Sequence, residues 1–526
     1  MRIVIASSEA VPFSKTGGLA DVAAALPKAL DQSGHDVSLI IPHYPQFDSG
    51  RPNRPTTETT SFCLRVAVGN KIVNARVLRA KLSRCRVTVY LVDQSSYFDR
   101  QGVYGEDNLD YQDNCERFVF FSRAVLEIIQ HFNLKPDVVH SNDWQTGLVP
   151  VLVAVEMRRR PGLDQTASVF TIHNMAFQGR FWHWDMHLTG LDWKYFNWRQ
   201  MESFGYLNLL KSGIAFADMV TTVSPTYARE IQTPEYGCGL HGVLSSRSCD
   251  LRGILNGVDT EIWNPSTDPY IAKPYTIDTV ELGKAACKAA LQKQLGLPVR
   301  PDVPLFGSVS RMTGQKGYSL IAQSANVLLD QDAQFIFLGS GESHYEDLLT
   351  DLAASHPQQV STTIGYNEKL SHQVEAGCDV FLMPSEFEPC GLNQMYSLIY
   401  GTVPLVRSVG GLADSVVNAD DQSIARGVAN GFSFPEFRSD VFLEQFCRAR
   451  SMYADKPTWR KLQQNGMLRD WSWKKSAAEY IQVYEKAISK RQLAAECSRG
   501  KSPVELTNRD TNSDCHSTSF ADGSLP

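Results

Sequence analysis

The chain alternates short, apolar, strand-like runs with stretches of helical periodicity, and this alternation constrains its fold more than any other feature. Strands of a parallel sheet are apolar along their whole length because helices cover both faces of the sheet. The pattern predicts an α/β protein with two Rossmann-like domains, one in each half of the chain. The predicted strands are 2–7, 36–42, 87–93, 137–143, 168–174 and 219–224, followed by 305–310, 334–340, 360–365, 379–385 and 403–408.

The boundary between the two domains is predicted near residues 251–269, where Gly, Asn, Pro and Asp are dense. We therefore expect a first domain over residues 1–250 and a second over 251–465. Residues 466–490 have the pattern of a final amphipathic helix. The polar residues that follow, 491–526, are predicted to be disordered.

A cationic, glycine-rich loop follows the first predicted strand. Lys15, Gly17 and Gly18 lie between that strand and a helical pattern at residues 20–30. The start of a helix offers unpaired N–H groups and partial positive charge, and glycines let backbone approach a ligand closely. The loop therefore suits a phosphate or diphosphate, although a tight turn with a surface lysine has the same residues.

Other charged residues also follow predicted strands, at the edge where open α/β sheets bind ligands. Arg311 and Lys316 are two cations that could hold a diphosphate and stabilise it as it departs. Glu388 precedes Pro-Cys-Gly and a helical pattern, so it could bind sugar hydroxyls beside the helix N-terminus. The alternatives are a solvated basic turn and an acidic helix cap.

Two further positions are open from the residues alone. Asp143 and His173 follow neighbouring strands and could be acid–base partners, ligands of sugar hydroxyls or members of a buried polar network. Tyr366 is an aromatic residue after a strand, which could stack on a base or pack in the core.

Composition excludes several classes of protein. The net charge of −6 gives no basic footprint for nucleic acid, and no stretch approaches the ~20 apolar residues of a membrane span. Eleven cysteines without a C-x-x-C pair indicate reduced thiols in a cytoplasmic protein. No metal site or cofactor is expected, because the D-x-D at Asp330–Asp332 follows a helical run and has the pattern of a helix end.

The order of the motifs is more specific than any one of them. They are SSEAVPFSKTGGLADV, HSNDWQTGL, HNMAFQG, SPTYAREIQTPEYGCGL, GILNGVD, SRMTGQKG, SEFEPCGL and GTVPLVRSVGGLADSV. From residue 1 to about 490 the chain resembles the bacterial glycogen and starch synthases. The resemblance implies the GT-B architecture, in which two Rossmann-like domains face a cleft and the last helix crosses back to the first domain. It also implies a retaining hexosyltransferase that moves glucose from ADP-glucose to an α-1,4-glucan or glycogen.

The resemblance also implies roles for particular residues. It assigns the diphosphate to Lys15, Arg311 and Lys316, and the adenine to Tyr366. The implied catalytic residues are Glu388, His173, Arg311 and Lys316. The implied ADP-glucose ligands are Lys15, Gly17, Gly18, Asp21, Asp143, Asn256, Arg311, Lys316, Tyr366, Cys390, Gly391 and Leu392.

The family retains the α configuration, and we favour a front-face mechanism in which the departing phosphate helps to deprotonate the glucan hydroxyl. Tyr396 stands where related GT-B enzymes carry a second glutamate, eight positions after Glu388. The sequence departs from the family at Asn142, where histidine is common, at His241, where an acidic residue is common, and at Glu386, where a basic residue is common.

Two alternatives remain at this point. One is a UDP-glucose-dependent or other GT-B glycosyltransferase, because the choice of base rests on the resemblance alone. The other is a non-catalytic, glucan-binding relative with the same fold. Such a protein would be expected to lose some of Lys15, Arg311, Lys316 or Glu388, and all four are present.

Overall fold

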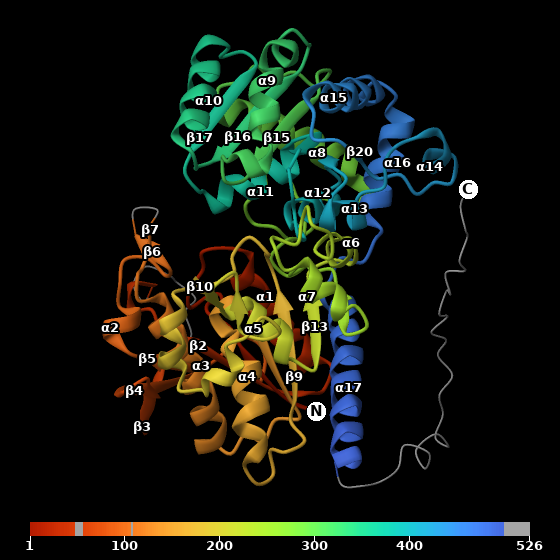
Figure 1. The fold of residues 1–526 in the computed structure, drawn as a ribbon. Helices are drawn as coiled ribbons and strands as arrows, with labels where there is room; N and C mark the ends of the chain where they lie inside the picture. The colour runs from red at the N-terminus through yellow and green to blue at the C-terminus, as the bar shows by residue number, and fades with distance from the viewer. Residues whose placement is uncertain (48–55, 107–108, 499–526) are drawn as a thin grey trace, which may run out of the picture.

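The computed structural model describes residues 1–47, 56–106 and 109–498, which form two α/β domains stacked end to end (Figure 1). Among these residues, nine strands make up the sheet of the first domain. Their order across the sheet is β14 (Leu251–Gly253), β13 (Met219–Thr222), β9 (Ala167–Ile172), β8 (Val138–Asn142), β1 (Arg2–Ala6), β2 (Asp36–Pro42), β5 (Thr88–Asp93), β4 (Lys71–Lys81) and β3 (Glu58–Val68).

The sheet of the first domain is parallel from β14 to β5, as the apolar runs predict. Strands β3 and β4 extend it as an antiparallel hairpin that the sequence analysis did not include. Their side chains alternate between buried and exposed, because this extension is covered on one face.

Helices cover both faces of the parallel strands. Leu26 of α1 (Gly18–Gln32) and Tyr480 of α17 (Trp473–Ser498) pack with Ile3 and Ile5 on one face. On the other face, Val4 and Ala6 pack against α3 (Asn114–His131), α4 (Leu148–Val155) and α5 (Leu209–Phe216). The first strand is therefore buried on both sides, and its C-terminal end carries the Lys15 loop.

The second domain repeats this plan. Six strands among the described residues form a parallel sheet in the order β17 (Val360–Ile364), β16 (Gln334–Gly339), β15 (Leu305–Val309), β18 (Val380–Met383), β19 (Val403–Arg407) and β20 (Phe432–Phe434). The helices around it are α8 (Val280–Gln294), α9 (Tyr318–Leu329), α10 (Ser343–Ser355), α11 (Glu368–Gly377), α12 (Asn393–Ile399), α13 (Gly410–Ser415), α15 (Ser439–Tyr453) and α16 (Lys456–Met467).

Shorter elements lie around the two sheets. They are α2 (Ser95–Phe98), α6 (Pro225–Glu230), α7 (His241–Ser246), α14 (Asp421–Ala425), β6 (Gly105–Glu106), β7 (Leu109–Asp110), β10 (Arg180–Phe181), β11 (Glu202–Ser203) and β12 (Tyr206–Asn208). Within the described part of the chain, no helix combines the length and the apolar character needed to cross a bilayer.

The structure corrects the predicted helix at 466–490. Helix α16 ends at Met467, and α17 begins only at Trp473. Between them the chain turns at 468–469, and the Val258 N–H then donates to the Trp471 carbonyl (2.7 Å), with Ser472 in a β-bridge to Val258. Helix α17 then runs along the first domain, in contact with α1 and β9 (Figure 1).

The predicted disorder of residues 491–526 is also wrong in part. Residues 491–498 continue α17. The Lys490 ammonium at the preceding turn binds the Asp250 carboxylate (2.7 Å), which ties this end of the helix to the first domain. Residues 499–526 lie outside the described part of the chain.

Candidate active site in the interdomain cleft

A cavity of about 1330 Å³ lies between the C-terminal ends of the two parallel sheets. Both domains contribute to its walls, which is the position that open α/β sheets use for ligands. Every predicted site residue lines it: Lys15, Gly17, Gly18, Asp21, Asp143, His173, Asn256, Arg311, Lys316, Tyr366, Glu388, Cys390, Gly391 and Leu392.

The Lys15 loop forms the wall of the first domain. The Lys15 ammonium binds the Asp21 carboxylate (2.9 Å), and about two-fifths of the lysine side chain is exposed. Gly17 precedes α1 and places no side chain over the first N–H groups of the helix. These N–H groups and the partly exposed Lys15 ammonium can therefore meet an anion in the cavity.

Glu9 is a cavity residue that the sequence analysis missed. Its carboxylate accepts hydrogen bonds from the N–H (2.5 Å) and the hydroxyl (2.8 Å) of Thr16, so it supports the Lys15 loop from beneath. Burial raises the pKa of Glu9 to about 7. An acidic residue directly after a buried strand, in Ser-Ser-Glu-Ala, is the signal that could have indicated it.

The second domain supplies two cations and a carboxylate. The Lys316 ammonium lies 2.6 Å from the Glu388 carboxylate, which also accepts a hydrogen bond from the Ser385 hydroxyl (3.3 Å). Arg311 is exposed, and within the described part of the chain its guanidinium donates a single long bond, to Gln315 (3.4 Å). Arg311 is thus available to an anion, while Lys316 is held in place by Glu388.

The segment after Glu388 is closely packed against its neighbours. Gly391 has a φ of +70°, and a Cβ on Gly410 would lie 2.0 Å from the Glu388 carbonyl oxygen. These positions therefore require glycine. Burial raises the pKa of the Cys390 thiol to about 12, so the thiol stays protonated. Asn256 lines the same cavity, and its buried side-chain oxygen has no hydrogen-bond partner among the described residues.

Asp143 and His173 are neighbours at the ends of β8 and β9. Asp143 has a φ of +55°, which is costly for a residue other than glycine, and its carboxylate accepts the His173 N–H (2.7 Å). Burial raises the pKa of Asp143 to about 7 and lowers that of His173 to about 3. The His173 imidazole is therefore neutral at pH 7, and its Nε2 lies 2.9 Å from the Asn142 side-chain oxygen.

Tyr366 stands at the mouth of the cavity with 70% of its surface exposed, and its hydroxyl donates to the Glu368 carboxylate. Deeper in the wall, the Trp263 ring is stacked between His372 (3.8 Å) and Tyr396 (3.9 Å). Tyr396 therefore packs against the segment that links the two domains.

His372 is held by carboxylates as well as by the Trp263 ring. Its Nδ1 lies 2.7 Å from the buried Asp268 carboxylate, and Glu368 lies on its other side, 3.5 Å from Nε2. Burial lowers the pKa of His372, but its ion pairs with the Asp268 and Glu368 carboxylates favour the protonated ring and raise the pKa to about 9.

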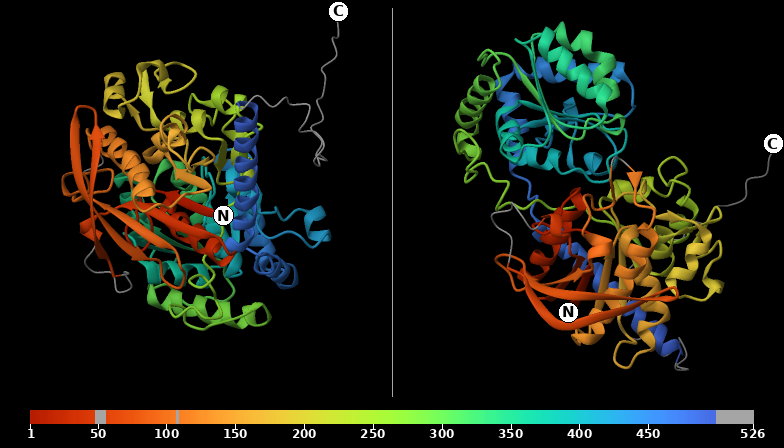
Figure 2. Two further views of the ribbon diagram at one scale, coloured as in Figure 1. Left: turned by 90° about the horizontal axis from the view of Figure 1, so that it is seen from below. Right: turned by 90° about the vertical axis from the view of Figure 1, so that its left-hand side faces the viewer.

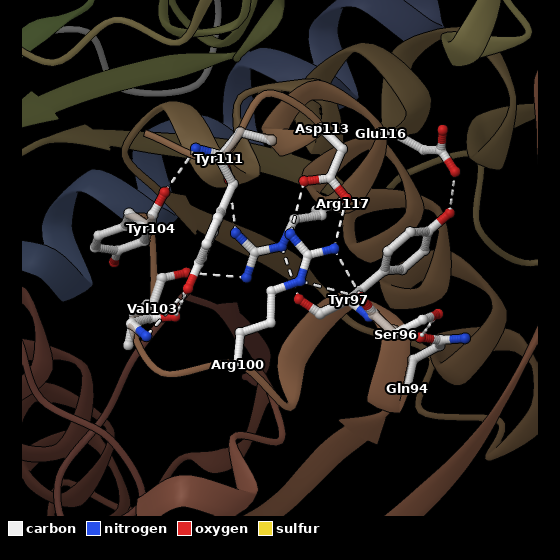
Figure 3. Close-up of polar contacts among 12 residues, drawn as sticks. Gln94, Ser96, Tyr97, Arg100, Val103, Tyr104, Tyr111, Asp113, Glu116 and Arg117 are labelled. Carbon is white, nitrogen blue, oxygen red and sulfur yellow. Dashed lines mark hydrogen bonds and ion pairs between the residues drawn. The ribbon is translucent and has the colours of Figure 1, made fainter. Parts of the chain in front are cut away.

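A second group that the sequence analysis missed is the wall formed by residues 100–106 and 109–117 (Figure 3). Arg117 is fully buried and donates to the carbonyls of Tyr97 (2.7 Å) and Val103 (2.9 Å). Arg100 binds the Asp113 carboxylate with two nitrogens (2.7 and 2.6 Å). Both guanidinium groups lie against the Tyr111 ring, which faces the cavity, so this wall has a fixed shape.

Two departures from the family pattern lie outside the cavity wall. The Glu386 side chain is exposed and is not among the cavity residues, so it does not confront an anion bound there. His241 lies at the start of α7 and is also outside the cavity wall. Asn142 replaces a common histidine and supplies the oxygen that meets His173.

The chain matches known families over both domains. Residues 2–246 match the family described as Starch synthase catalytic domain, and residues 292–466 match Glycosyl transferases group 1. A glycogen synthase of Anaeromyxobacter dehalogenans is 46% identical over 485 residues, covering 92% of this chain and 99% of the relative. A glycogen synthase of Syntrophotalea carbinolica is 43% identical over 488 residues, covering 93% and 99%.

Solved structures agree with these matches. The catalytic domain of starch synthase IV from Arabidopsis thaliana, bound to ADP and acarbose, is 35% identical with a TM-score of 0.84. The match covers 93% of this chain and 99% of that structure. A sucrose-phosphate synthase from Thermosynechococcus elongatus, 17% identical with a TM-score of 0.56, shares the fold. The chain therefore belongs to the glycogen and starch synthase family of GT-B glycosyltransferases.

Proposed function

We propose that this enzyme transfers glucose from ADP-glucose to the non-reducing end of an α-1,4-glucan such as glycogen, with retention of configuration and release of ADP. One observation carries the proposal. Lys15 comes from the first domain and Arg311 and Lys316 from the second, and all three line one cavity with Glu388. Three cations around a single cavity suit a diphosphate leaving group.

The proposed division of labour follows the two domains. The second domain, over residues 251–465, holds the nucleotide, with the base against Tyr366. The first domain, over residues 1–250, holds the glucan acceptor and closes over the diphosphate with Lys15. Of residues 466–490, proposed to cross back to the first domain, we assign that role to the part that belongs to α17, which contacts α1 and β9.

The proposed chemistry is the exchange of one C1–O bond for another. The bond between glucose C1 and the diphosphate oxygen breaks, while a bond forms between C1 and O4 of the acceptor on the same face. The proton of the acceptor hydroxyl passes to the departing phosphate oxygen. Arg311 and Lys316 stabilise the negative charge that develops on the diphosphate.

The remaining polar groups position the sugar. Glu388, fixed by Lys316 and Ser385, orients glucose hydroxyls rather than attacking C1. The His173 imidazole is proposed to lie beside the transferred glucose. Because the ring is neutral, it can donate or accept a hydrogen bond there without repelling the positive charge that develops at C1. Asp143 and Asn256 are proposed as further hydrogen-bonding partners of the donor.

The test is glucose incorporation into glycogen from radiolabelled ADP-glucose and, separately, UDP-glucose, without added metal. Strong incorporation from ADP-glucose alone is the expected result. Incorporation from UDP-glucose alone would overturn the donor while leaving the reaction class intact. Failure with both donors would refute the proposal and favour a non-catalytic relative that binds glucan.

A further inference from the structure

His372 is a buried histidine of α11, beside the catalytic cavity, that the mechanism proposed above does not use. Its Nδ1 lies 2.7 Å from the carboxylate of Asp268, which is itself fully buried. Its Nε2 is buried too, and within the described part of the chain this atom has no hydrogen-bond partner. It faces the Glu368 carboxylate at 3.5 Å, one turn earlier on the same helix. One side of the ring is therefore fixed, and the other is directed at a carboxylate.

The interdomain linker, residues 254–279 between β14 and α8, holds the His372 ring in this orientation. The linker passes between the two domains, which lie one above the other in the right-hand view of Figure 2. Its Trp263 ring stacks on the imidazole, with the centroids 3.8 Å apart and the planes 7° from parallel. Its Asp268 also accepts a hydrogen bond from the Tyr400 hydroxyl (2.5 Å). Turning the His372 ring would break the stack and the buried ion pair, so Nε2 stays directed at Glu368.

The Glu368 carboxylate connects His372 to the ring that is proposed to meet the base. It accepts a hydrogen bond from the Tyr366 hydroxyl. The backbone between the two residues is fixed as well, because the Asn367 side chain caps α11 by accepting the Leu370 N–H (2.9 Å). The Tyr366 side chain is mostly exposed, so packing alone does not fix its ring. The bond from its hydroxyl to Glu368 therefore limits the rotation of the ring.

The charges along these contacts alternate in sign. His372 lies between the Asp268 and Glu368 carboxylates, and its pKa of about 9 keeps the ring cationic at pH 7. The cationic ring in turn lowers the pKa of Glu368, so that carboxyl group stays ionised. A charged acceptor forms a stronger hydrogen bond to a hydroxyl than a neutral acceptor does. His372 therefore strengthens the hold of Glu368 on Tyr366.

Packing of the linker onto α11 does not account for the charge of His372. An apolar ring would stack on Trp263 equally well, and a buried cation is costly unless it is paired. Here one of its two partners, Glu368, lines the catalytic cavity together with Tyr366. The part of this cluster that packing leaves unexplained thus leads to the nucleotide end of the proposed site.

We propose that His372 and Glu368 are positioning residues for the base of the nucleotide donor. His372 holds the Glu368 carboxylate, and the carboxylate holds the Tyr366 hydroxyl, so that a face of the Tyr366 ring stays open to the cavity. The proposal rests on the proposed function, which places the base against this ring. A ring that is fixed before the donor arrives loses less rotational freedom on binding, so the base binds more tightly. The reacting groups around Glu388 lie outside these contacts.

The first experiment measures the binding of ADP and of inorganic pyrophosphate by calorimetry, without glucan, to the wild-type enzyme and to His372→Gln. Pyrophosphate has the diphosphate but no base. We expect the Kd for ADP to rise about fivefold in the variant, a part of what one stack of a base on an aromatic ring contributes. The Kd for pyrophosphate should stay unchanged. The matched control is His356→Gln, at a histidine of the second domain outside the cavity wall that contacts the Ser355 hydroxyl (3.0 Å).

A double-mutant cycle separates positioning from packing. Tyr366→Phe keeps the ring and removes its hydroxyl, so it should weaken ADP binding by a similar factor. Because His372 acts through that hydroxyl, adding His372→Gln to Tyr366→Phe should have no further effect. Glu368→Gln is made as well, since this side chain is about half exposed and its replacement leaves His372 in contact with Asp268 and Trp263. It should show the same rise in Kd and the same lack of additivity.

In transfer assays, the effect of both variants should fall on the KM for ADP-glucose rather than on kcat. An unchanged Kd for ADP, an equal rise for ADP and pyrophosphate, or additive effects with Tyr366→Phe would overturn the proposal. The binding measurements need no turnover, so they remain decisive if transfer from ADP-glucose fails. An enzyme that uses UDP-glucose is tested in the same way with UDP, because every base has a face that can stack. A wild-type enzyme that bound neither nucleotide would overturn this proposal together with the proposed function.

Discussion

Replacing Glu388 with glutamine tests the centre of the proposed site. The substitution keeps the size of the side chain and an oxygen that can accept from Lys316, but it removes the negative charge 2.6 Å from the ammonium. Glu388 is 7% exposed, so solvent screens its charge only weakly. The change therefore alters one charge and little else.

The expected magnitudes follow from this geometry. Breaking a buried ion pair by removing one partner costs about 3–5 kcal/mol. The Lys316 side chain is about one-fifth exposed, and glutamine retains one hydrogen bond, so we expect a loss of about 2 kcal/mol. For a domain of this size that loss lowers Tm by about 4–8 °C. Turnover should fall about 100- to 1000-fold, the effect of losing one preorganised polar group in an active site.

The assay measures initial rates of transfer from ADP-glucose to glycogen at saturating concentrations, together with thermal unfolding by circular dichroism. Ser385→Ala is the matched control, because it removes only the 3.3 Å hydrogen bond to the same carboxylate. It should retain most of the turnover. Near-normal turnover in Glu388→Gln would refute the central place of this carboxylate. A loss of turnover that only parallels a loss of folded protein would refute it equally.

The remaining predictions concern other parts of the same structure. Lys15→Ala should raise the KM for ADP-glucose about tenfold, as expected for one lost charge contact to phosphate, and an unchanged KM would exclude the assigned role. Glu9 has a folded pKa of about 7, above its ordinary value of 4.5, so its contribution to stability is complete below pH 4.5 and is lost as the pH rises through 7. Thermal unfolding from pH 5 to 8 should show a smaller decline in Glu9→Gln than in the wild type. The pKa of His372 is about 9, so its contribution is complete below pH 6.5 and is lost as the pH rises through 9, and His372→Gln should lack the fall in Tm between pH 7 and 9.5. Truncation after Ser498 keeps every cavity residue, so transfer activity should stay intact. A full loss of activity would show that the removed residues contribute to it.

The parallel strands could be predicted from the sequence because each is apolar along its whole length. Residues 36–42 and 334–340 are examples, and the structure places β2 and β16 there. The β3–β4 hairpin was missed because alternating side chains of an exposed extension give a weaker signal than a buried run. The available sequence signal for a hairpin was the Gly69–Asn70 pair between two alternating segments. The structure gives Gly69 a φ of +55°, as such a turn requires.

The cavity residues that were predicted follow the ends of apolar strands, as Asp143 and His173 do. Glu9 also follows a strand, but nothing in its immediate sequence shows that Thr16 will bond to it. Tyr111 was not predictable in this way, because its place depends on two arginines. Contacts between a guanidinium and an aromatic ring at such irregular spacing leave no helix or strand pattern in the sequence.

The position of Glu388 depends on both domains, although the residue belongs to the second. The Pro389 carbonyl accepts a hydrogen bond from the Ser224 hydroxyl (2.7 Å) at the start of α6 in the first domain. At the other end of α6, the Glu230 carboxylate accepts the Gly410 N–H (3.0 Å), and Gly410 packs directly on the Glu388 carbonyl. These two contacts couple α6 of the first domain to the segment that carries the proposed catalytic carboxylate. Because Lys15 lies on the opposite wall, binding of a diphosphate between the domains would fix the Lys15 loop and the Glu388 segment in the same event.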